Sequence, residues 1–143
     1  MKSAIPFALA AAALWLLPSL SASADAMSLG EFEYRNSCSA CHGPKGDGDG
    51  PLAQYLTIQT LPQLSMLQKN NGGVFPVQRV YSVIDGTADV AAHGNRDMPV
   101  WGQRYRARID PETDFEFGPE ETEAYVRTRI LALIEYLSTI QAK

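Results

Sequence analysis

The sequence predicts an all-α protein that forms one domain. No segment alternates apolar and polar residues over the length of a strand, whereas several segments repeat their apolar residues with the period of a helix. Clusters of Gly and Pro separate these helical segments. Without its first 24 residues, the 143-residue chain keeps 119 residues, a length that suits one domain.

Residues 1–24 predict an export signal. Lys2 supplies the positive start, residues 4–17 are almost wholly apolar, and small residues follow. A small-x-small pattern predicts cleavage after Ala24, and a second such pattern would move the cut to Ala26. We therefore expect a protein exported to a bacterial periplasm.

Residues 25–143 are expected to form the mature domain. An uncleaved anchor is the alternative, but a membrane span needs about 20 apolar residues, and Pro18 interrupts this shorter stretch. Lys2 is the one charge in the signal, so the mature chain keeps 11 basic and 16 acidic residues, a net charge of −5. This balance argues against nucleic acid as a partner, and we expect no insertion of the mature chain into a membrane.

The first predicted helix runs from Ser28 to Cys41. Ser28 is a suitable N-cap, and Glu31 three residues later completes a capping-box pattern. Gly43 and Pro44 predict its end, because glycine favours the C-terminal turn and proline cannot continue the helix.

Two shorter helices are predicted in the middle of the chain. A Gly- and Pro-rich loop over residues 43–51 precedes them, and it lacks the later ligands of a calcium loop. A short helix is predicted over 62–68. A second helix, over 76–84, would begin at Pro76 and end before Gly86. Its apolar stripe consists of Val77, Val80, Tyr81 and Ile84.

The last predicted helix runs from Pro119 to about Gln141. Pro119 fits the first helical position, and acidic residues follow it. Before this helix, segment 102–119 is polar and carries three arginines and then four acids, which we interpret as a solvated loop, with a docking surface as the alternative. The apolar stripe of the helix consists of Val126, Ile130, Leu133, Leu137 and Ile140.

Residues 38–42 read Cys-x-x-Cys-His, the pattern to which a c-type haem is attached. Cys38 and Cys41 would lie on one face of a helical turn, so both thiols can bond the two vinyl groups at one porphyrin edge. His42 would then be placed to bind the iron. The pattern predicts one covalently bound haem c.

Other interpretations of the two cysteines fit less well. A structural zinc site needs four ligands, and the chain has no further cysteine and only His93 besides His42 as a histidine. A thioredoxin-like pair would need a βαβ context. A simple disulfide would close a small, strained loop.

Met98 is the best candidate for the second iron ligand. Pro99 restricts Met98 to extended geometry, and a neutral thioether stabilises reduced iron. The rival is His93, which lies in a polar loop. Met66 falls in a predicted helix and Met27 precedes the first helix, so both are weaker candidates.

With these residues identified, the mature chain resembles the class I bacterial cytochromes c. The attachment motif is highly specific and the Met-Pro pair moderately so, whereas the glycine loop and the last helix would be weak alone. The resemblance rests, in chain order, on Gly30-x-x-x-Tyr34 before the attachment motif, on Gly46-x-Gly48-x-Gly50-Pro51, on Met98-Pro99-Val100-Trp101-Gly102, and on Ile134-Glu135-Tyr136-Leu137.

The resemblance implies a cytochrome c fold of four to five helices wrapped around one haem, with the first and last helices crossing. It implies that Gly30 is small where the last helix passes over it, near Tyr136 and Leu137. It also implies that the Pro51 carbonyl accepts the free ring N–H of His42. Segment 102–119 is longer than in many members of the family.

These expectations predict a periplasmic electron carrier, not an enzyme, with His42 and Met98 filling both axial positions of the iron. The partners would be a donor dehydrogenase and a terminal acceptor, met as a monomer through transient complexes. The alternative is a dedicated haem subunit of a larger periplasmic or membrane-bound oxidoreductase, docked through segment 102–119. Catalysis or gas sensing at an open haem would require that Met98 does not bind.

Overall fold

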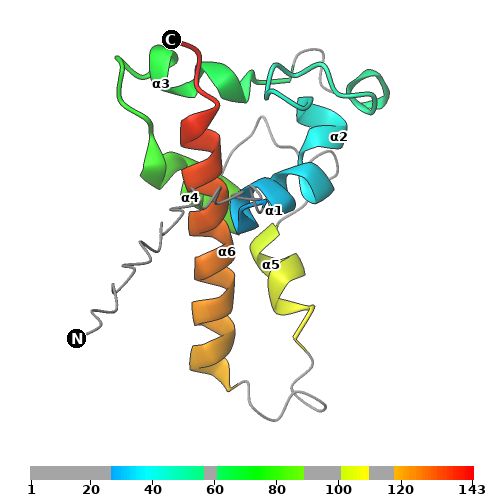
Figure 1. Ribbon diagram of the computed structural model, residues 1–143. Coiled ribbons are helices and arrows are strands. Elements are labelled where there is room, and N and C mark those ends of the chain that lie inside the picture. The colour runs from blue at the N-terminus through cyan, green and yellow to red at the C-terminus, as the bar shows by residue number, and fades with distance from the viewer. Residues whose placement is uncertain (1–26, 57–60, 89–100, 110–117) are drawn as a thin grey trace, which may run out of the picture.

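The computed structural model describes residues 27–56, 61–88, 101–109 and 118–143. All regular elements in these ranges are helical, which confirms the predicted all-α class. None of the helices described there is long and apolar enough to cross a bilayer. In chain order the elements are α1 Leu29–Ser37, α2 Ser39–His42, the 3₁₀ turns η1 Ala53–Tyr55 and η2 Leu64–Met66, α3 Leu67–Asn70, α4 Val77–Asp85, α5 Trp101–Arg106 and α6 Pro119–Thr139 (Figure 1).

The predicted first helix is in fact two helices, α1 and α2, that meet at Cys38. The Ser28 hydroxyl caps α1 as predicted, accepting from the backbone N–H of Glu31 at 3.1 Å. At the break, the Ser39 hydroxyl donates to the carbonyl of Arg35 at 2.8 Å. This side-chain bond competes with the backbone bond that a continuous helix would make there.

The middle of the chain follows the prediction in outline. α4 is preceded by Pro76 and ends at Gly86, whose φ of +84° is left-handed and favours glycine. Val80 and Ile84 are buried on its inner face, whereas Val77 in its first turn is 48% exposed. The predicted helix over 62–68 forms instead as η2 followed by α3.

Helix α5 was not predicted, because arginines mask its apolar residues. Trp101, Tyr105 and Ile109 recur every four residues and are buried. The guanidinium of Arg104 lies 5.0 Å from the centre of the Trp101 ring, and that of Arg108 lies 5.5 Å from the centre of the Tyr105 ring. Cation–π contacts of this kind let charged residues cover aromatic ones.

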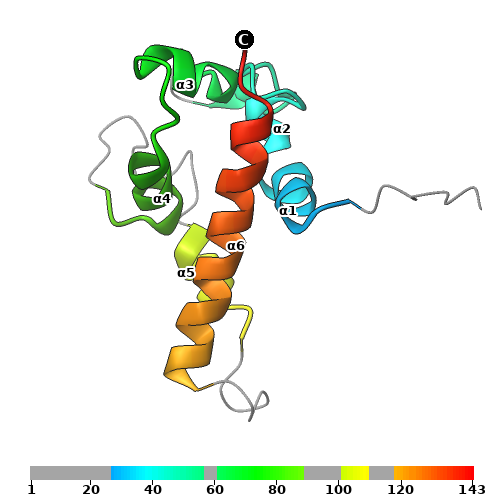
Figure 2. The ribbon, with the colours of Figure 1, turned by 60° about the vertical axis from the view of Figure 1, so that its left-hand side comes forward.

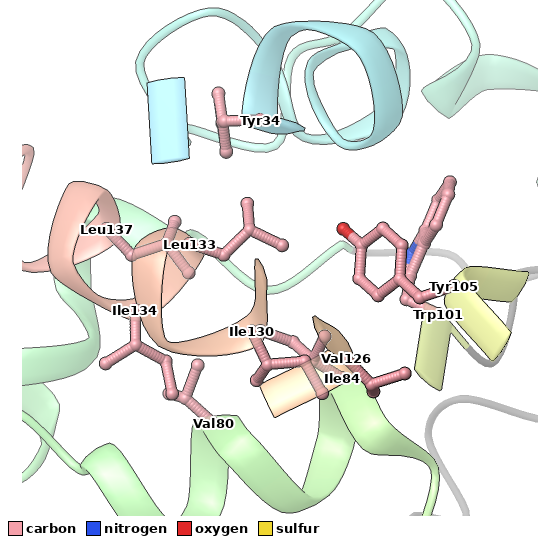
Figure 3. Packing of buried hydrophobic residues seen from close by; sticks show 10 residues of the cluster. All are labelled: Tyr34, Val80, Ile84, Trp101, Tyr105, Val126, Ile130, Leu133, Ile134 and Leu137. Atoms are coloured by element: carbon pink, nitrogen blue, oxygen red, sulfur yellow. The ribbon is translucent and has the colours of Figure 1, made fainter. Parts of the chain in front are cut away.

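Helix α6 is the central element, and α1, α4 and α5 all pack against it. Figures 1 and 2 show α1 and α2 on one side of α6 and α4 on the other, with α5 beside its N-terminal half. The core forms where these helices meet (Figure 3). Its buried residues are Tyr34, Val80, Ile84, Trp101, Tyr105, Val126, Ile130, Leu133, Ile134 and Leu137.

Helix α1 crosses α6 at Gly30. A Cβ atom at this position would lie 2.0 Å from the Ala132 carbonyl oxygen and 2.9 Å from the Cβ of Tyr136. The expected small residue at the crossing is therefore present. Tyr136 lies at the crossing as expected, and the backbone that comes closest is that of Ala132, one turn before Tyr136.

The C-terminal end of α6 is tied to η2 and α3. The Gln141 side chain donates to the Leu64 carbonyl at 2.8 Å and accepts from the Gln68 backbone N–H at 2.8 Å. The Ala142 N–H donates to the Ser65 carbonyl at 2.7 Å. These bonds fix the segment that closes one end of the molecule.

Candidate functional site

Cys38 and His42 line one cavity of about 300 Å³. The His42 ring is buried. Helices α4, α5 and α6 supply the apolar walls of the cavity, and the segment around α3 supplies the rest. The other lining residues are Pro62, Gln63, Leu64, Leu67, Asn70, Asn71, Pro76, Arg79, Val80, Val83, Ile84, Trp101, Leu133 and Leu137.

Tyr34 fixes the end of α2 to the core. Its hydroxyl is buried and donates to the Gly43 carbonyl at 2.6 Å. Its ring lies 5.2 Å from that of Tyr136 on α6. Burial raises the pKa of Tyr34 well above its ordinary value, so the hydroxyl stays a donor at neutral pH. The motif residues are thereby held at a defined place relative to α6.

The glycine loop folds back and satisfies the last carbonyls of α2. The C-terminal carbonyls of a helix have no partners within the helix, so they need donors from elsewhere. Four backbone N–H groups supply them here, which pins the loop against the motif. The bonds run from Gly43 to Ser39 (2.9 Å), from Leu52 to Ala40 (2.8 Å), from Gly50 to Cys41 (3.1 Å) and from Gly48 to His42 (2.9 Å).

Gly50 permits the closest approach of the loop to the motif. A Cβ atom there would lie 2.5 Å from the Ala40 carbonyl oxygen and 2.6 Å from that of Cys41. Gly43 and Gly48 have φ angles of +79° and +81°, which favour glycine. The glycines therefore allow both the turns of the loop and its contact with α2.

The two thiols are free and partly buried, and they are not joined by a disulfide. Burial, followed by the charge of a thiolate on Cys41, raises the pKa of Cys38 to about 12. Cys38 lines the cavity, whereas Cys41 is not among the lining residues in the part of the chain that the structure describes.

Pro51 lies next to the motif, between the two bonds that Gly50 and Leu52 make to it. Its carbonyl accepts from the Gln54 side chain at 3.1 Å. The expected bond from the His42 ring to this carbonyl stays a prediction.

The candidate second ligands fall into two groups. Met98 and its rival His93 lie outside the described residues, as do Pro99 and the predicted export signal. Met66 is partly buried in η2 but does not line the cavity in the described part of the chain, and Met27 is 48% exposed. Met98 therefore stays a prediction as the second iron ligand.

A buried charged cluster, which we call the Glu33 cluster, lies where α1, α5 and α6 meet. Glu33 is fully buried, accepts from the Tyr105 hydroxyl at 3.1 Å and pairs with Arg129. Arg108 lies 3.9 Å from the same carboxylate. Burial lowers the pKa of Arg129, whose guanidinium also lies 4.5 Å from the centre of the Tyr125 ring. This cluster could not be predicted from the sequence, because the position of Glu33 in a helix does not indicate that its side chain is buried.

Comparisons with known proteins add no relative. No protein-family model, curated protein or solved structure matches the chain. Within the described ranges, no three His, Cys, Asp or Glu side chains gather as a metal-binding group. The site is therefore interpreted from its own residues and their geometry.

Proposed function

We propose that the protein is a c-type cytochrome that carries one covalently bound haem and transfers single electrons between proteins of the bacterial periplasm. One observation carries this proposal. Cys38 and His42, which belong to the haem-attachment pattern, line the same apolar cavity as residues of α4, α5 and α6. An apolar cavity with few polar groups is the usual form of a cofactor site.

The residues that are present fit this cofactor. The imidazole of His42 can bind the iron, and the thiols of Cys38 and Cys41 can each form a thioether with a vinyl group. Bound there, the haem would supply an iron that cycles between the ferrous and ferric states. The apolar walls would keep water from the haem, and the Pro51 carbonyl would accept the free ring N–H of His42 and so orient the ring.

Met98 completes the proposal as the second residue that would bind the iron. It stands three residues before Trp101, a cavity-lining residue, so covalent geometry keeps their Cα atoms within about 11 Å. With both His42 and Met98 bound to it, the iron would have no position left for a substrate. Such a site would suit electron transfer and not catalysis, and a neutral sulfur ligand would favour a fairly high potential.

The arginines of segment 102–119 favour a free carrier over a fixed subunit. Arg106 pairs with Glu123 at 2.7 Å and with Asp85 at 3.4 Å. Arg104 stacks on Trp101, and Arg108 lies against the Tyr105 ring and near Glu33. Because these guanidinium groups already contact side chains of the protein itself, they are less available to bind a partner enzyme. The partners we propose are a donor dehydrogenase and a terminal acceptor.

The decisive experiment is production of the full chain in a bacterium that matures c-type cytochromes. We expect one haem that stays with the polypeptide after denaturation and acid extraction, and an intact mass raised by one haem. Changing both Cys38 and Cys41 to Ser should abolish the linkage, whereas the control Ala40→Ser, at the exposed position between them, should retain it. A wild-type product without haem would refute the proposal.

The second ligand needs its own spectroscopic test. We expect the oxidised wild type to show a sulfur-to-iron charge-transfer band and Met98→Ala to lack it. His93→Ala should retain the band. If the band is missing from the wild type, or survives in Met98→Ala, then Met98 does not bind the iron.

A further inference from the structure

Arg79 is the one fully charged side chain among the lining residues that the structure describes for the cavity. It lies on α4, beside Val80 and four residues before Val83, so it belongs to the helix face that forms the cavity wall. Arg79 is exposed, whereas Val80 is buried. This pattern places the guanidinium at the mouth of the cavity and the apolar residues of α4 inside it.

Arg79 has no ionic partner in the described part of the chain, unlike most arginines there. Arg35, Arg106, Arg108 and Arg129 each lie within 4.0 Å of a carboxylate oxygen, and Arg104 stacks on an aromatic ring. Only Arg79 and Arg127 have neither kind of contact in the ranges described. Of these two, only Arg79 lines the cavity.

Three uncharged polar residues also line the cavity. They are Gln63, Asn70 and Asn71, and the Asn71 amide donates to the Val74 carbonyl at 2.8 Å. Amide and guanidinium N–H groups are the donors that carboxylates accept from. An anionic group of the cavity's ligand would therefore be stabilised by these polar side chains and not by the apolar walls, and among them Arg79 carries the full positive charge.

The proposed function supplies such an anionic group. A haem carries its two carboxylates on the edge opposite the vinyl groups that bond to cysteine. The lining residues Cys38 and His42 are the N-cap and the last residue of α2, and Figure 2 shows α1 and α2 on one side of α6 and α4 on the other. Attachment at Cys38 and Cys41 therefore directs the carboxylate edge away from α2, toward α4 and its arginine.

We infer that Arg79 is a positioning residue that binds a haem carboxylate at the mouth of the cavity and thereby raises the reduction potential. This inference rests on the proposed function. A cation paired with the carboxylate offsets its negative charge, and a negative charge near the iron stabilises the ferric state. Removing the cation should therefore favour oxidation.

The test compares two single-charge variants of the haem-loaded protein. Arg79→Gln should shift the equilibrium toward the ferric form by about three- to tenfold, which is about 30–60 mV for one electron. Arg127→Gln removes the same charge from an exposed helical position outside the cavity, so the shift should stay below about twofold. Potentials are measured by spectroelectrochemistry at low ionic strength.

A third variant, Arg79→Lys, keeps the charge and should restore most of the potential. The inference is overturned if Arg79→Gln and Arg127→Gln shift the potential equally, or if Arg79→Lys behaves like Arg79→Gln. Both results require a protein that holds haem. A chain that holds none would instead refute the proposed function, so the two failures are distinguishable.

Discussion

At the scale of single residues, Glu33 shows the cost of a charge placed in the core. Its carboxylate is fully buried and is held by Arg129 and the Tyr105 hydroxyl. Glu31, two residues earlier on the same helix, instead makes a surface pair with Arg35 at 2.6 Å. Both acids are glutamates of the same helix, but the carboxylate of Glu33 is fully buried, whereas the pair of Glu31 with Arg35 lies at the surface.

We expect Glu33→Gln to destabilise the protein by about 3 kcal/mol, because it leaves the partly buried charge of Arg129 without its partner in the core. The matched change Glu31→Gln should cost at most about 0.5 kcal/mol, since exposed pairs of this spacing contribute little. Urea unfolding followed by circular dichroism measures both. Equal losses would show that the Glu33 cluster is not a buried ion pair in solution.

At the scale of helices, local signals predicted most of the elements but not their breaks. The cap at Ser28, the glycine at 86 and the apolar period of α6 act within a few residues, so the sequence reveals them. The break at Cys38 depends on whether the hydroxyl or the backbone N–H of Ser39 donates to the Arg35 carbonyl. Helix α5 depends on the burial of Trp101 and Tyr105 in the core and on the pairs of Arg106 with Asp85 and Glu123, which are distant in the chain and leave no local pattern.

The crossing of α1 and α6 gives a test at this scale. Gly30→Ala would normally stabilise a helix by about 0.5–1 kcal/mol. Here the added methyl group would meet the Ala132 backbone at 2.0 Å, so we expect a net loss of about 3 kcal/mol from overpacking.

A matched glycine separates this collision from backbone effects. A methyl group added at Gly73 would have no atom within 4 Å, and the φ of Gly73 is +86°. Gly73→Ala should therefore cost only about 1 kcal/mol of backbone strain. Thermal unfolding compares the two variants, and a stable Gly30→Ala protein would mean that the helices cross elsewhere.

The link between α5 and α6 should depend on pH. The Arg106 guanidinium bonds to Glu123 at 2.7 Å and lowers the pKa of that carboxyl below its ordinary value. A lowered pKa in the folded state means that the contribution is present above the unfolded pKa and is lost as the pH falls through the folded one. We expect Glu123→Gln to speed amide exchange in α5 at pH 7, and its difference from the wild type to vanish in strong acid.

At the scale of the whole molecule, the cavity explains why the site could be predicted only in part. The attachment motif is contiguous, so Cys38, Cys41 and His42 were identified from five residues. The wall of the cavity is assembled from α3, α4, α5 and α6, which are far apart in the chain. Arg79 carried no signal of its own, because a lone helical arginine is ordinarily a solvated residue.

The apolar walls of the cavity predict the fate of a chain without cofactor. Without a bound group these walls would face water, which costs about 25 cal/mol per Å² of apolar surface. We expect the variant with both motif cysteines changed to Ser to lose fixed packing. It should keep much of its far-UV signal, lose near-UV circular dichroism and bind a hydrophobic dye.

The contact between Gly30 and Ala132 joins parts of the chain that are about a hundred residues apart. The core therefore cannot form until almost the whole chain has been synthesised and has reached the compartment in which the protein folds. A chain threaded through a membrane from its amino end would expose residues 38–42 throughout that passage. In such a chain the order of delivery would leave time for chemistry on the two thiols before α6 completes the core against which Cys38 packs.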